Sequence, residues 1–204
     1  MAERIDYYFS TISTWAYLGH DAFLAMARRH GVEVRFKPVP LLAVFAESGG
    51  LPLGKRHPLR QTYRSFEAQR WRARRGLPLE LKPAHFPFDA TLADCAALAL
   101  ADRPEICGQF CSTAMRGVWT HQNLADEATI RAHVAAAGAD PEATLAAAKG
   151  DAVKGAYAAN GRAALAAGVF GSPAYVRDGE VFWGQDRRDF LEEAIASGRA
   201  GYRA

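Results

Sequence analysis

The stretch Ile5-Asp6-Tyr7-Tyr8-Phe9-Ser10-Thr11-Ile12-Ser13-Thr14-Trp15-Ala16 decides which fold this chain is expected to adopt. Residues 5–9 are rich in aromatic and β-branched side chains and predict a strand. An apolar pattern with helical spacing follows from Ala16 to Ala27, and Gly31 is of the type that commonly ends a helix. Residues 32–36 alternate apolar and polar side chains, which predicts a second strand. Strand, helix and strand at this spacing predict a βαβ unit with two parallel strands.

The end of the chain predicts the other half of a thioredoxin-like core. Residues 174–177 and 181–183 predict two short strands around Asp178-Gly179, a strong hairpin turn motif. Asp186 is expected to open a final helix, whose inner face carries Phe190, Leu191, Ala194 and Ile195.

The residues between these two parts have a different character. Residues 40–57 are predicted to be loop-like because of Ser48-Gly49-Gly50 and Pro52, whereas residues 58–75 are predicted to be helical. Alanine, the strongest helix former, dominates further predicted helices at 89–102, 105–120, 126–137, 141–149 and 151–167. We therefore predict an α/β fold in which a split thioredoxin-like core, residues 1–40 and 168–204, surrounds an all-helical insertion of residues 41–167.

Composition narrows the class of protein. The net charge of +3 is too small to indicate nucleic-acid binding, and no apolar run approaches the roughly 18 residues of a membrane span. No leader precedes the first strand, so a cytoplasmic protein is expected. The three cysteines, Cys95, Cys107 and Cys111, form no disulfide framework and suit a reducing compartment. We expect packed thiols and no metal site.

A basic segment within residues 55–75 has two interpretations. Arg56, Arg60 and Arg64 share one helix face, while Leu59, Tyr63 and Phe66 form an apolar stripe on another. A solvated helix surface explains most of these arginines. Alternatively, one or two of them face the active site and bind carboxylates, because a planar guanidinium matches that group.

Ser13 stands where a thiol-disulfide enzyme of this fold would carry the first cysteine of Cys-x-x-Cys, and Ala16 replaces the second. A serine cannot form a mixed disulfide, but its hydroxyl can hydrogen-bond the thiolate of a bound thiol such as glutathione. Free amides at a helix start also favour a thiolate. The alternative is that Ser13 is only a helix N-cap.

Two downstream features complete the candidate site. Pro173 is expected to form a cis peptide bond, which would leave the Ser172 backbone free to pair with a bound peptide; an ordinary trans proline is the alternative. Asp186 either caps the last helix or holds an ammonium group, and Gln185 and nearby amides suit a carboxylate. Trp183 is explained equally well as a core residue.

Ser13 with Trp15, Tyr17-Leu18-Gly19, the Gly168–Pro173 segment and Phe182–Arg187 resemble the 2-hydroxychromene-2-carboxylate isomerases. That family is related to the kappa-class glutathione transferases and to the DsbA group of thioredoxin-like proteins. The resemblance spans nearly the whole chain. It implies glutathione as the cofactor, a small aromatic carboxylate as the substrate, a setting in the degradation of aromatic compounds, and a homodimer.

The resemblance also implies individual roles. Ser13 would be the catalytic residue, and glutathione would be bound by Arg60, Ser172, Pro173, Trp183, Gly184, Gln185 and Asp186. The substrate would lie near Lys37, Gly49, Gly50 and Phe86. Two residues depart from the family: Thr14 replaces the usual proline and loses its fixed φ angle, and Gly50 replaces a common asparagine and loses a side-chain donor.

The expected activity is therefore a glutathione-dependent isomerisation, in which a thiolate adds to an unsaturated carbon, a bond rotates and glutathione leaves unchanged. Two alternatives stay open. A glutathione transferase would use the same site and release a conjugate, and a non-catalytic module would bind peptides through Ser172 and Pro173. A disulfide oxidoreductase is disfavoured by Ser13 and Ala16.

Overall fold

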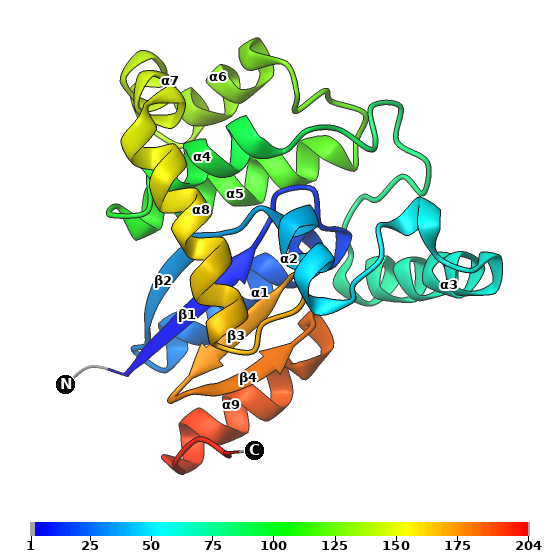
Figure 1. The fold of residues 1–204 in the computed structure, drawn as a ribbon, viewed down its shortest axis with the longest axis vertical. Helices are drawn as coiled ribbons and strands as arrows, with labels where there is room; N and C mark the ends of the chain where they lie inside the picture. The colour runs from blue at the N-terminus through cyan, green and yellow to red at the C-terminus, as the bar shows by residue number, and fades with distance from the viewer. Residues whose placement is uncertain (1–2, 204) are drawn as a thin grey trace.

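The computed structural model describes residues 3–203, and four strands in this part of the chain form one mixed sheet (Figure 1). The strands are β1 (Arg4–Phe9), β2 (Glu33–Pro38), β3 (Ala174–Arg177) and β4 (Glu180–Trp183), in the order β2-β1-β3-β4. β1 runs parallel to β2 and antiparallel to β3, and β3 forms a hairpin with β4. The predicted βαβ unit and hairpin are confirmed.

Helices connect and cover the strands. α1 (Thr14–Arg29) joins β1 to β2, and α9 (Arg188–Ser197) follows β4 after a short 3-10 turn, η2 (Gln185–Arg187). Between β2 and β3 lie α2 (Leu41–Ser48), the 3-10 turn η1 (Leu53–Lys55), α3 (Pro58–Arg75), α4 (Thr91–Ala99), α5 (Pro104–Val118), α6 (Glu127–Ala136), α7 (Pro141–Lys149) and α8 (Asp151–Ala166). This is the predicted thioredoxin-like α/β fold with a helical insertion.

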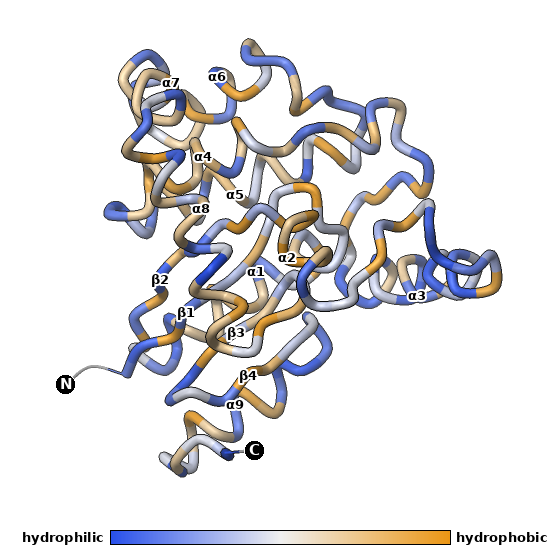
Figure 2. The backbone as a smooth tube through the Cα atoms, viewed as in Figure 1, coloured by the Kyte–Doolittle hydropathy of each residue, from blue (hydrophilic) through white to orange (hydrophobic). Residues whose placement is uncertain are grey.

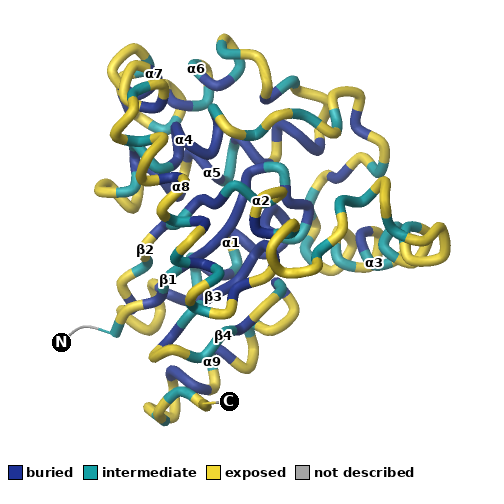
Figure 3. Tube along the Cα trace, viewed as in Figure 1, coloured by how far each residue is buried: buried dark blue, intermediate teal, exposed yellow. Residues whose placement is uncertain are grey.

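The insertion lies mainly at one end of the sheet. Figure 1 shows α4–α7 above the strands, α8 passing in front of them and α3 standing at the side. Most of α3 is exposed, as Figure 3 shows, including the predicted apolar stripe of Leu59, Tyr63 and Phe66. Among the described residues, no helix has the length and apolarity needed to cross a membrane.

Two predictions of secondary structure were wrong. Residues 40–57 are not simply loop, because α2 occupies Leu41–Ser48 and ends where Gly49 takes a left-handed φ of 75°. The Ser48-Gly49-Gly50 motif therefore marks a helix end. The final helix begins at Arg188 and not at Asp186, which lies in the preceding 3-10 turn. Phe190 is 59% exposed, because the buried stripe of α9 is formed by Leu191, Ala194 and Ile195.

Alternation along β1 gives the sheet two covered faces. Tyr7 and Phe9 point into the larger core, where the Tyr7 ring stacks on Phe9 at 4.6 Å and on Tyr175 at 5.4 Å between centroids. Tyr8 points the other way into a smaller cluster with Val39. Figure 3 shows that β1 and β3 are largely buried, whereas α3, which Figure 2 shows as mostly hydrophilic, is largely exposed. Each fully buried aromatic side chain contributes roughly 1.5–3 kcal/mol, so the core holds the β1–α1 connection rigidly.

The cysteines behave as predicted from their spacing. Cys95, Cys107 and Cys111 are all free and buried, and burial is the first cause that raises the pKa of the Cys95 thiol to about 11. They are therefore packed thiols, and none of them occupies the start of α1, where the first cysteine of a redox pair would stand.

Candidate active site

Ser13 is both a helix cap and a bridge to a distant loop. It is the N-cap of α1, with extended backbone angles, and its Oγ accepts a hydrogen bond from the Ala16 amide at 3.2 Å. The same hydroxyl donates to the Ser172 carbonyl oxygen at 3.0 Å. The capping interpretation and the active-site interpretation are therefore compatible, because one hydroxyl can both accept and donate.

The loop opposite Ser13 has the predicted geometry. The Ser172–Pro173 peptide bond is cis, which confirms that prediction. The Pro173 carbonyl accepts a hydrogen bond from the Gly184 amide at 2.9 Å, and the Ser172 hydroxyl accepts one from the Ser10 amide at 3.1 Å. The start of α1 therefore meets the loop of Ser172 and Pro173, which is distant in the sequence and is itself bonded to the end of β4.

A cavity of about 340 Å³ opens beside this meeting point. Its lining includes aromatic side chains from α1, α3 and β4 together with polar groups that follow β4: Trp15, Tyr63, Glu67, Trp71, Ser172, Trp183, Gly184, Gln185, Asp186 and Arg187. Five of the residues predicted to bind glutathione line this one cavity. Its volume is within the usual range for small-molecule sites.

Trp183 does not behave as a core residue. It is 51% exposed, and its ring packs against Phe170 at 4.6 Å between centroids. Gly171 must lack a side chain here, because a Cβ atom at that position would collide with the Trp183 indole. The indole therefore forms a wall of the cavity that is open to a ligand.

Arginines of α3 reach this site. Arg64 donates a hydrogen bond to the Thr14 hydroxyl, and its guanidinium lies 5.9 Å from the Trp15 ring centroid. Burial, followed by the charge of Arg56, lowers the pKa of Arg64, although a guanidinium remains charged at neutral pH. Arg75 donates to the Gln185 side-chain oxygen at 3.0 Å. Neither arginine lines the cavity, but their contacts favour the alternative in which one or two arginines of this helix face the site.

Other predicted residues do not line this cavity. Arg60 is exposed in the first turn of α3, one turn before Arg64. Lys37 lies 3.1 Å from the Asp6 carboxylate and over the Tyr8 ring. Phe86 packs against Trp119 at 5.1 Å between centroids.

Gly49 and Gly50 follow the end of α2, and they too lie outside the lining of the cavity. A Cβ atom at Gly50 would collide with the Phe45 ring. In this arrangement the position has no room for the asparagine that the resemblance leads one to expect.

One buried carboxylate was not predicted. Asp94, in the first turn of α4, is fully buried and accepts hydrogen bonds from the turn between β1 and α1. Burial is the main cause that raises its pKa to about 6. A single acid within the apolar run Leu92-Ala93-Asp94-Cys95-Ala96 was the available indication, because a charge among buried positions needs partners.

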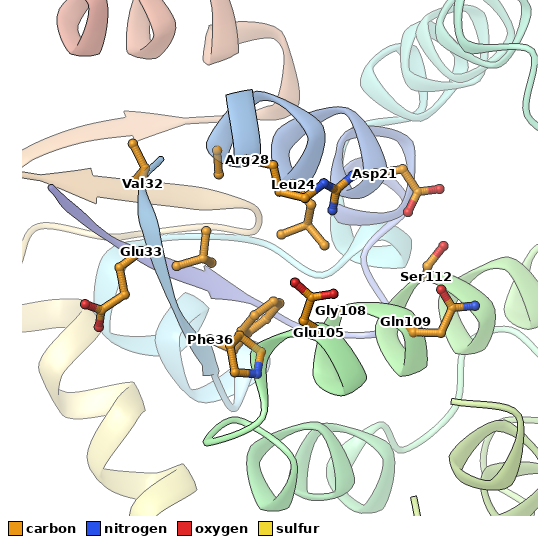
Figure 4. Close-up of a pocket in the computed structure, with 13 residues that line it drawn as sticks. Asp21, Leu24, Arg28, Val32, Glu33, Phe36, Glu105, Gly108, Gln109 and Ser112 are labelled. Atoms are coloured by element: carbon orange, nitrogen blue, oxygen red, sulfur yellow. The ribbon is translucent and has the colours of Figure 1, made fainter. Parts of the chain in front are cut away.

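A larger cavity, of about 490 Å³, lies elsewhere, between α1, β2 and α5 (Figure 4). Leu24 and Phe36 face into it, and Glu105 and Gln109 of α5 form the opposite wall. None of the predicted site residues lines it. Ser13 and Pro173 do not line the smaller cavity themselves. We favour it as the active site because Ser172, which lines it, accepts the hydrogen bond of the Ser13 hydroxyl at the start of α1.

A thioredoxin-like fold with serine in place of the first redox cysteine defines the class of this protein. The family model of the DSBA-like thioredoxin domain matches residues 4–196, so the chain belongs to that family. A protein of Sphingobium xenophagum named 2-hydroxychromene-2-carboxylate isomerase is 28% identical over 199 residues, which cover 96% of this chain and 99% of that protein. These findings confirm the resemblance noted from the sequence.

Solved structures agree on the fold. The structure of a 2-hydroxychromene-2-carboxylate isomerase superposes with a TM-score of 0.81 and 23% identity, covering 95% of each chain. The cytosolic disulfide reductase DsbM from Pseudomonas aeruginosa with GSH has a TM-score of 0.66 and 18% identity, covering 95% of this chain and 99% of that one. At such identities these similarities establish the fold alone.

Proposed function

We propose that this protein is a glutathione-dependent isomerase of a small aromatic carboxylate, of the 2-hydroxychromene-2-carboxylate isomerase type. The isomerase part is supported by the name of the relative that matches along the whole chain. The observation that carries the glutathione part is the Ser13 hydroxyl, held 3.0 Å from the Ser172 carbonyl at the start of α1.

The groups around the cavity suit glutathione. Asp186 and Arg187 form an ion pair at 2.8 Å in the free protein. On binding, Asp186 would turn its carboxylate to an ammonium group, while Arg187 and Gln185 would donate to a carboxylate. The Ser172 backbone, next to the cis bond, would pair with an extended peptide in the cavity that this residue lines. When bound there, glutathione would supply a sulfur nucleophile that adds reversibly to an unsaturated carbon of the substrate.

Ser13 would make that sulfur reactive. A free thiol has a pKa of about 8.5 and is mostly protonated at neutral pH. The first amides of α1 have no partner within the helix and carry part of the positive end of its dipole. The Ser13 hydroxyl, now donating to Ser172, would turn to donate to the thiolate, and the two effects together would lower the thiol pKa by about one to two units.

Arg64 is our candidate for binding the substrate carboxylate. It contacts Thr14, the neighbour of Ser13, and covers the Trp15 ring, which faces the cavity. An aromatic substrate would pack on the indole rings while its carboxylate meets the guanidinium. Arg60, which the resemblance assigns to glutathione binding, lies one turn further from this contact along α3 and serves as the matched comparison.

A single assay tests the proposed function. The protein is incubated with 2-hydroxychromene-2-carboxylate with and without glutathione, isomerisation is followed by absorbance, and glutathione is recovered for mass spectrometry. We expect turnover only with glutathione, which returns as the free tripeptide. Recovery of a conjugate would identify a transferase instead, and turnover that is independent of glutathione would refute the role of the thiol. The cytoplasmic location expected from the sequence and the homodimer implied by the resemblance are two further proposals.

A further inference from the structure

We propose that Asp94, which belongs to the helical insertion, is a positioning residue for Ser13. Its carboxylate holds the turn that leads to the Ser13 hydroxyl. This role rests on the proposed function. Asp94 does not touch the cavity described above. It would act through Ser10 and Thr11, which belong to the turn between β1 and α1.

The carboxylate is fully occupied by donors. Its Oδ1 atom accepts from the Thr11 amide at 2.7 Å and from the Thr11 hydroxyl at 2.8 Å. Its Oδ2 atom accepts from the Ser10 hydroxyl at 2.7 Å and from the Tyr157 hydroxyl at 2.9 Å. Three of the four donors therefore come from the turn, and the fourth comes from α8.

A short path leads from this carboxylate to Ser13. The Ser10 carbonyl accepts a hydrogen bond from the Ser13 amide at 3.0 Å, and the Ser10 amide donates to the Ser172 hydroxyl. Ser13 in turn donates to the Ser172 carbonyl. The Ser10 residue that Asp94 holds therefore orients both sides of the contact between Ser13 and Ser172.

An ionised aspartate suits this place because all four partners donate. A carboxylate has acceptor positions for all of them. The NH₂ group of an asparagine would keep its contacts only if the hydroxyls facing it turned from donating to accepting. The raised pKa, about 6, leaves Asp94 largely ionised at neutral pH. The titratable groups that interact with Asp94 are Cys95 of α4, Cys111 of α5 and Tyr157 of α8. Lys154 of α8 and Asp89, in the loop before α4, act on its neighbour Cys95.

The alternative is that Asp94 only ties helices together. Tyr157 separates the two roles, because its hydroxyl bridges Asp94 and the Val39 carbonyl without touching the turn. Tyr157→Phe removes the donor on the α8 side and leaves the three turn bonds in place. Asp140→Asn is a matched control, because Asp140 caps α7 in the same insertion, away from the turn, and asparagine caps a helix about as well.

The experiment compares Asp94→Ala, Asp94→Asn, Tyr157→Phe and Asp140→Asn with the wild type. Amide hydrogen exchange of residues 10–16 is measured in the free protein, and the thiol pKa of bound glutathione and the kinetic constants are measured in the complex. We expect both Asp94 variants to speed exchange in the turn and to raise the bound thiol pKa. They should lower kcat by roughly tenfold to a hundredfold, the loss typical of a misplaced catalytic group. The glutathione dissociation constant should change far less, since the Trp183–Asp186 segment is intact.

Tyr157→Phe and Asp140→Asn should leave the bound thiol pKa at the wild-type value. If Asp94→Ala fails to fold, Asp94→Asn, which keeps the side-chain volume, carries the test. A folded Asp94→Asn protein with wild-type exchange, thiol pKa and kcat would overturn the positioning role while the proposed function stands. A wild-type protein that does not bind glutathione would instead refute the proposed function and, with it, the catalytic consequence assigned to Asp94.

Discussion

Replacing Asp94 with asparagine should change how the stability of this protein depends on pH. Burial is the largest influence on the pKa of Asp94 and raises it from 3.8 to about 6, although hydrogen bonds from Thr11, Ser10 and Tyr157 act in the opposite direction. Because one pKa unit corresponds to about 1.4 kcal/mol, this shift corresponds to about 3 kcal/mol. Compared with the protonated carboxyl group, the ionised carboxylate therefore makes the folded protein less stable, even though it accepts the hydrogen bonds that order the turn.

The sign of the effect follows from proton binding. Below about pH 4, the carboxyl group is protonated in both the folded and the unfolded protein, and its favourable contribution is fully present. Between about pH 4 and pH 6 the folded protein binds more protons than the unfolded chain does. The contribution of Asp94 therefore decreases as the pH rises, and it is lost above about pH 6.

Urea unfolding of the wild type and of Asp94→Asn across this pH range measures the effect. The free energy of unfolding of the variant, minus that of the wild type, should increase by about 3 kcal/mol between about pH 4 and pH 7. Asp89→Asn is the control of opposite sign, because hydrogen bonds from Thr91 lower the pKa of that exposed carboxyl group. A difference for Asp94→Asn that is flat, or that decreases with pH, would refute the reasoning.

Three further substitutions test other parts of the structure. Arg64→Ala should raise KM for the aromatic carboxylate about tenfold, by removing a charged hydrogen bond, whereas Arg60→Ala should change it much less; equal effects in steady-state kinetics would contradict the assignment. Thr14→Pro removes the acceptor of Arg64 but suits the first position of α1, so thermal unfolding should show no loss of stability, and a clear decrease would contradict this. Phe23→Ala should lower the free energy of unfolding in urea by about 3–5 kcal/mol, because the fully buried ring would leave a cavity in the core. A loss below about 1 kcal/mol would mean that the surrounding core closes around the smaller side chain.

Local patterns were sufficient to predict most of the fold. The helix predicted over residues 58–75 has the same first and last residues as α3. The strands of the core lie where alternation and the Asp178-Gly179 turn indicated. The segment of α2 was missed because Ser48-Gly49-Gly50 is equally typical of a loop and of a helix end. Such a motif does not reveal which structure precedes it.

The candidate site was predictable only where it depended on motifs. Ser13, Ser172 and the Trp183–Asp186 segment meet as expected because the thioredoxin-like topology brings the start of α1 next to the cis proline. Sequence spacing could not tell Arg60 from Arg64, because they share a helix face and only the docking of α3 decides which one reaches Thr14. Asp94 lies more than 80 residues from its partners in the turn, and the sequence around Asp94 does not indicate which residues these partners are.

The thiol pKa of bound glutathione tests the central claim most directly. Titration of thiolate absorbance in complexes with the wild type and with Ser13→Ala gives this value without dependence on the physiological substrate. We predict that the wild type lowers the thiol pKa by about one to two units from its free value, near 8.5, and that Ser13→Ala reverses much of that decrease. The same pKa in both complexes, or no binding of glutathione to the wild type, would contradict the role of Ser13.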